Sequence, residues 1–104
     1  MKIFVEIKKL AGEFAENKDI AKEIRVNQIM PMLADDKVVV LDFSGVSGTT
    51  QSFIHALISE PIRQFRDVAL EKIEYKNCSG IVREVVKTIY EYMQESFNFE
   101  TYEE

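Results

Sequence analysis

Residues 38–43, with the sequence VVVLDF, constrain the fold of this chain more than any other stretch. The run is short and rich in β-branched residues, which favours a strand over a helix. A strand that is apolar at nearly every position is typical of a parallel sheet whose two faces are covered by helices. The run therefore predicts a central, buried strand.

Two further stretches carry the alternating pattern of half-buried strands. Residues 2–7 (KIFVEI) alternate apolar and charged side chains almost throughout. Residues 70–76 (LEKIEYK) alternate again, with Ile73 and Tyr75 on one face and more charge than the central run. These stretches predict a first and a third strand.

Three amphipathic segments have the spacing of helices. The first begins near Ile20 and contains Pro31, which removes one amide donor and is expected to kink or split the helix. The second covers residues 53–65, and we expect Pro61 to bend or restart it. The third covers residues 81–93, where apolar residues form a strong stripe.

The order of these segments is strand, helix, strand, helix, strand, helix. Such alternation predicts an α/β fold in which a single layer of mostly parallel sheet packs against α-helices. No repeat or internal boundary divides the chain, so residues 1–95 are predicted to form one domain. Residues 96–104 (SFNFETYEE) are predicted to form an acidic, aromatic tail.

Composition excludes several classes of function. The chain has 104 residues and a formal net charge of −5, whereas a protein that binds nucleic acid usually carries a basic face. It has no apolar run of about 20 residues, and charges interrupt its N-terminal stretch, so neither a membrane span nor a signal peptide is expected. Cys78 and His55 are the only residues of their types, which argues against a zinc site. We therefore expect a cytoplasmic protein without metal or other cofactor.

The loop that follows the central strand is rich in hydroxyl groups, and it lies where parallel sheets often meet their ligands. Helix capping, an anion pocket and a phosphorylation switch are three ways to use such a loop, and Thr49 or Thr50 is the expected cap of the next helix. Asp42, at the end of the strand, is expected to brace the loop by accepting amide hydrogen bonds. The hydroxyl residues of this loop are Ser44, Ser47, Thr49, Thr50 and Ser52.

The same stretch resembles the STAS-like family, which includes small bacterial proteins of uncharacterised function and, more distantly, anti-sigma-factor antagonists. The resemblance rests on Asp42-Phe43-Ser44-Gly45-Val46 at the end of the strand, a short loop, and Ser52-Phe53 at the start of a helix. Residues 24–33 (IRVNQIMPML) also resemble the preceding helix of that group, including its proline. The resemblance covers roughly residues 20 to 93.

The resemblance implies a regulatory module that binds proteins and is not an enzyme. Its partner would be a histidine-kinase-type ATPase or a transcription regulator, with a second copy of the chain as a further candidate. In the antagonists a kinase phosphorylates a serine or threonine at the start of the helix. Here Gln51 occupies that position, so either the acceptor is Ser52 or Thr50, or this protein does not use such a switch. The implied binding surface consists of Asp42, Ser44, Ser47, Thr49, Thr50, Ser52 and Phe53.

Two alternatives start from other residues. His55 or Cys78 could serve as the reactive group of an enzyme, or of a binder of small anions or nucleotides, that uses the same loop. Against this, an exposed helix histidine and an inert buried cysteine are the ordinary interpretations of these residues. The aromatic residues of the tail could instead dock on a partner or a second copy, which would make the chain a structural subunit.

Overall fold

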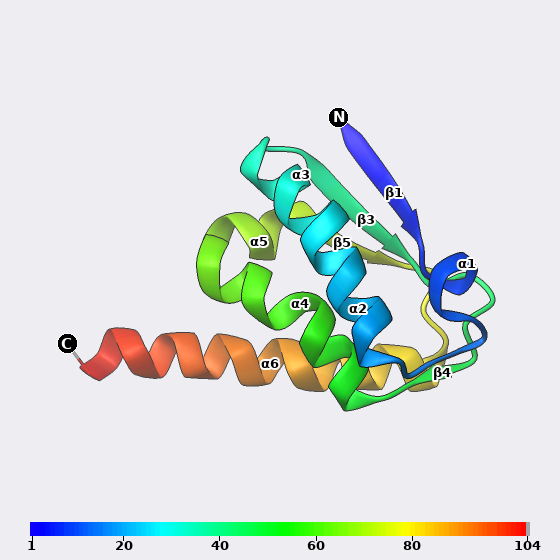
Figure 1. Cartoon of the computed structure of the whole chain (residues 1–104). Helices are drawn as coiled ribbons and strands as arrows, with labels where there is room; N and C mark the ends of the chain where they lie inside the picture. The colour runs from blue at the N-terminus through cyan, green and yellow to red at the C-terminus, as the bar shows by residue number, and fades with distance from the viewer. Residues whose placement is uncertain (104) are drawn as a thin grey trace.

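Three parallel strands form the main sheet of the computed structural model, in the order β1–β3–β5 (Figure 1). The structure describes the backbone of residues 1–103 and the side chains of residues 1–94. The central strand β3 (Val38–Asp42) pairs with β1 (Lys2–Glu6) on one side and with β5 (Ile73–Lys76) on the other. All three predicted strands are confirmed, and the VVVLDF run is central.

Two crossovers connect these strands. The first contains α1 (Ile7–Ala11), β2 (Phe14–Ala15), α2 (Lys18–Ile24), the π-helical turn η1 (Arg25–Ile29) and α3 (Met30–Ala34). The second contains β4 (Gly48–Thr49), α4 (Gln51–Phe65) and α5 (Asp67–Lys72), and α6 (Gly80–Glu103) follows β5. Both crossovers step in the same direction across the sheet, so right-handed connections place their helices on one face. Figure 1 shows α4 between α2 and α6, and α4 packs against both.

The helices cover one face of the sheet. On that face Val5, Val39, Leu41 and Ile73 are buried against the helices. The α/β fold with a single parallel layer is therefore confirmed. The domain division at residue 95 stays a prediction, because the side chains of the tail lie outside those that the structure describes.

The opposite face of the sheet is covered by side chains and not by a described helix, so the expectation that helices cover both faces of β3 was wrong. Val40 is only 1% exposed there, although its neighbour Phe4 is 54% exposed. Lys2 and Glu74 form an ion pair across this face at 3.3 Å, and the Lys76 ammonium lies 5.5 Å from the centre of the Phe4 ring. Long side chains from the two edge strands thus shield the central valine from water.

Pro31 has the local effect that the sequence predicted. The π-helical turn η1 ends two residues before it, and the Met30 amide bonds to the Arg25 carbonyl five residues back. Pro31 then lies in the first turn of α3, where its missing amide costs least. The helix is split at the proline without losing its direction along the sheet (Figure 1).

Pro61 does not have the predicted effect, because α4 continues through it to Phe65. Pro61 is buried, as are its neighbours in the core, and tertiary packing outweighs the loss of one helical hydrogen bond. The break comes instead at Arg66, whose φ is 53°. The short helix α5 then occupies residues that were predicted to begin the third strand, so β5 is shorter than expected.

The sequence did not predict α1 or the small parallel sheet formed by β2 and β4. Both are short, and the sheet joins two segments of only two residues each, which no periodicity can indicate. The helix α6 contains the predicted stripe of residues 81–93 and extends to Glu103.

Candidate functional site

The loop between β3 and α4 begins at a carboxylate that is held from two sides. Asp42 Oδ1 accepts a hydrogen bond from the Ser44 amide at 2.9 Å and another from Asn77 Nδ2 at 3.0 Å. The bond from Asn77, the bond from the Ser44 amide and, to a smaller extent, the positive charge of Lys76 hold the pKa of Asp42 below its ordinary value, although burial opposes them. Asp42 therefore braces the start of the loop, as its place in the sequence predicted.

The middle of the loop is tied to the first crossover. Ser47 Oγ donates to the Glu13 carbonyl at 3.2 Å, and Thr49 Oγ1 donates to the Ala15 carbonyl at 2.6 Å. Thr49 is only 6% exposed, because β4 lies against β2 at this point. Gly48 permits this close approach, since a Cβ there would lie 2.8 Å from the Phe14 ring.

The end of the loop caps α4. Thr50 has extended backbone geometry, and its hydroxyl oxygen accepts a hydrogen bond from the Phe53 amide at 3.1 Å. This is the cap that the sequence predicted, and Thr50 is half-buried as a result. Phe53 is fully buried and anchors the first turn of α4 in the core.

Two hydroxyls of the loop point to solvent and neither tie the loop to other elements nor cap a helix. Ser44 and Ser52 are exposed, and no described residue forms a hydrogen bond with either hydroxyl. Ser52 is the second residue of α4, so a phosphate there would meet the positive end of a 15-residue helix. The two predicted acceptors therefore differ, because the Thr50 hydroxyl caps α4 and the Ser52 hydroxyl is free.

Ser52 opens onto a groove of about 540 Å³ between α4 and α6. Charged, polar and apolar side chains are mixed in it, and Tyr92 is 61% exposed. The groove is wide enough for side chains of another protein to enter. It is lined by Lys18, Gln51, Ser52, His55, Ala56, Thr88, Ile89 and Tyr92.

Ser44 faces a different hollow of about 470 Å³ at the carboxyl ends of β1 and β3. Acidic and basic groups both line it, because Glu6 and Asp42 lie with Lys8 and Lys9. This mixed charge favours neither anions nor cations. Of the predicted binding residues, Asp42 and Ser44 therefore line one surface and Ser52 lines another, while Thr49 and Phe53 are buried.

The two candidate reactive residues lie apart. His55 is exposed in the groove beside Ser52, and no described hydrogen bond joins the two residues. Cys78 is half-buried after β5, and burial raises the pKa of its thiol above the ordinary value. A raised pKa leaves less thiolate at neutral pH, which does not favour a reactive role for Cys78.

Sequence reasoning missed the turn between β5 and α6 as a support of the loop. Asn77 reaches Asp42 from a left-handed backbone conformation, with φ of 58°. Ser79 Oγ donates to the Ser47 carbonyl at 3.4 Å and also caps α6 by accepting from the Val82 amide. The signal was available, because the carboxyl ends of parallel strands meet at one edge of a sheet.

The described residues provide neither a cluster of metal ligands nor a helix that could span a membrane. They contain no group of three or more His, Cys, Asp and Glu side chains arranged to hold a metal ion. Within the same part of the chain, no helix combines the length and the apolar character that crossing a membrane requires.

Comparison with known proteins gives one match. The sequence model of a family described as "STAS-like domain of unknown function (DUF4325)" matches residues 20–83, which is more than half of the chain. The match includes most of α2 and all of β3, the hydroxyl-rich loop, α4 and β5. No curated protein and no solved structure matches significantly.

Proposed function

Because this chain belongs to the family of STAS-like domains of unknown function, we propose that it is a regulatory module that binds a protein partner and catalyses no reaction. The recognition surface consists of the end of the loop next to α4 (residues 50–53), the first turns of α4 and the groove between α4 and α6. The partner is a kinase-type ATPase or a transcription regulator, as the resemblance to anti-sigma-factor antagonists implies.

One observation carries this proposal. Ser52 presents a free, exposed hydroxyl at the start of α4, while the hydroxyls of Ser47, Thr49 and Thr50 hold the loop in place. An accessible hydroxyl at the start of a helix, in a loop that its other hydroxyls hold in place, is suited to a switch, because a modification there changes the surface and leaves the fold intact.

The surroundings of Ser52 support a phosphorylation switch there. Phosphate would add nearly two negative charges, and the N-terminal end of α4 stabilises negative charge. Lys18 lines the same groove and supplies a positive charge that the phosphate could approach. A partner that contacts Tyr92 and His55 across the groove would meet these new charges directly.

Phosphopeptide mapping and binding measurements test this function together. Proteins captured from native cells are identified by mass spectrometry, and the affinity of the purified partner is measured for wild type, Ser52→Glu and Ser44→Glu. We expect phosphate on Ser52 and about tenfold weaker binding of Ser52→Glu, since a charge buried in an interface is costly. Ser44→Glu is the matched control, because it adds the same charge to the same loop outside the groove.

Two results would contradict the proposal. One is equal affinity of all three proteins for the partner. The other is a kinase-dependent phosphate that is found only outside residues 50 and 52.

A further inference from the structure

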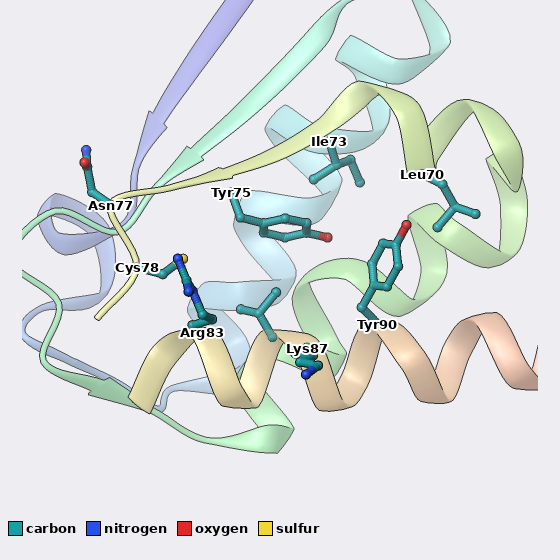
Figure 2. Close-up of a pocket in the computed structure, with 9 residues that line it drawn as sticks. Leu70, Ile73, Tyr75, Asn77, Cys78, Arg83, Lys87 and Tyr90 are labelled. Carbon is teal, nitrogen blue, oxygen red and sulfur yellow. The ribbon is translucent and has the colours of Figure 1, made fainter. Parts of the chain in front are cut away.

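A second groove lies on the opposite side of α6, between this helix and the edge strand β5 (Figure 2). Its volume is about 470 Å³. Tyr75 projects into it from β5, while Arg83 and Tyr90 rise from α6 toward Cys78 and Leu70. None of its lining residues belongs to the loop that is proposed to bind the regulatory partner.

The backbone of β5 is unpaired along this groove. The Lys76 carbonyl accepts from the Phe43 amide, so Lys76 and Glu74 direct their backbone groups inward to β3. Backbone groups alternate along a strand, so the amide and carbonyl of Tyr75 point outward. No described residue bonds to them, and β5 is therefore an open edge of the sheet.

The side chains of the groove favour an acidic occupant. Arg83 and Lys87 are one turn apart on α6 and exposed, and neither is paired with a carboxylate of the described residues. No acidic side chain lines the groove, although the chain as a whole carries a net charge of −5. This is a local positive site on an acidic protein.

The floor of the groove offers apolar contacts, and the Tyr75 hydroxyl offers a polar one. Ile73 and Val86 are buried beneath the groove, and Leu70 is half-buried at one end. No described residue forms a hydrogen bond with the Tyr75 hydroxyl, and burial raises the pKa of this phenol, so the hydroxyl stays protonated and able to donate.

We propose that this groove binds an extended, acidic segment of a partner protein, which adds to β5 as a further strand of the sheet. The segment bonds to the outward amide and carbonyl of Tyr75, and its side chains alternate between the two faces of the enlarged sheet. The side chains of the segment that face α6 lie over Val86 and place their carboxylates beside Arg83 and Lys87. The site is separate from the Ser52 surface and does not depend on its function.

The groove is also linked to the loop. Asn77 lies at one end of the groove and donates to Asp42, and Ser79 in the same turn donates to Ser47. A strand bound at β5 would extend toward this turn. The segment therefore binds next to two of the hydrogen bonds that hold the loop, and it is placed to stabilise them.

The test uses the whole chain and a labelled short peptide of alternating glutamate and valine. Binding is measured by fluorescence anisotropy and by the NMR signals of backbone amides. We expect the Tyr75 amide to shift and to exchange with solvent more slowly when the peptide binds. The double variant Arg83→Glu with Lys87→Glu is expected to bind about tenfold more weakly. Its matched control is Lys22→Glu with Arg63→Glu, which reverses two exposed charges on other helices and is expected to bind like wild type.

Two further peptides separate strand addition from attraction between charges. A peptide with lysine in place of glutamate, and a peptide with alternate amides methylated, are both expected to bind at least tenfold more weakly. Equal binding of either peptide would overturn the proposal, as would peptide-induced shifts confined to residues outside β5 and α6. If sodium glutarate displaced the peptide at millimolar concentration, the groove would be a site for small anions instead, and the proposal would fail.

Discussion

At the scale of single residues, Asp42 joins the loop to the neighbouring strand end through one carboxylate oxygen. Its pKa is lowered by Asn77, the Ser44 amide and Lys76, so its charged form is bound more tightly in the folded state. A carboxyl whose pKa falls on folding stabilises the fold above its unfolded value, near 3.8, and loses that contribution as the pH falls through the folded value.

We therefore expect wild type to be more stable than Asp42→Asn at neutral pH, and the difference to shrink as the pH falls below 3.8. Asparagine keeps an oxygen that can accept from Ser44 and Asn77, so the comparison isolates the charge. Urea denaturation from neutral pH to about pH 3 measures the free energies of unfolding. A difference that is independent of pH would show that the charge contributes nothing to the brace.

At the scale of the elements, the break between α4 and α5 depends on one unusual backbone conformation. Arg66 has φ of 53° and ψ of −120°, a region that glycine enters easily and residues with a Cβ enter at a cost. Arg66→Gly and Arg66→Ala both remove the interactions of the arginine side chain. The difference between these two variants therefore reports on the backbone alone.

We expect Arg66→Gly to be more stable than Arg66→Ala by about 1 kcal/mol or more, the reverse of the order found inside helices. Thermal or urea unfolding of both proteins measures the difference. Arg63→Gly and Arg63→Ala provide the control, because Arg63 lies within α4 and alanine is expected to be the more stable there. The same order at both positions would mean that Arg66 is not strained.

The elements also show what the sequence could predict. The continuous apolar run of β3 and the helical stripe of α6 are evident in the sequence, because a buried strand and a helix with one buried face require these patterns. Pro61 misled the prediction of α4, since a local rule on proline gave way to packing in the core. The pairing of β2 with β4 joins residues that are far apart in sequence, and only the folded structure brings Phe14 over Gly48.

At the scale of the whole molecule, the loop could be located from the sequence, but the different structural roles of its hydroxyl residues could not be predicted. In the sequence alone, the hydroxyl residues of the loop look equivalent. Their roles differ because Glu13 and Ala15 approach from the first crossover, and Ser79 approaches from the turn before α6. The groove at β5 is likewise invisible in the sequence, since an open strand edge depends on which strands become neighbours.

The whole molecule also predicts where the chain can be shortened. Among the described side chains, the last member of the hydrophobic core is Met93. We therefore expect removal of residues 96–104 to preserve cooperative unfolding and to change the free energy of unfolding by less than about 1 kcal/mol. Removal of all of α6 is the control, because it takes Val82, Val86, Ile89 and Met93 from the core and is expected to prevent folding.

Urea denaturation and light scattering of the shortened chain complete this test. A module that acts through the loop and α4 is expected to keep its oligomeric state and its affinity for the loop partner when the tail is removed. A smaller number of copies in the assembly would mean that the chain assembles through Phe97, Phe99 or Tyr102, whose side chains lie outside those described. Loss of cooperative unfolding would mean that the domain extends past residue 95, because the end of α6 would then contribute to the stability of the core.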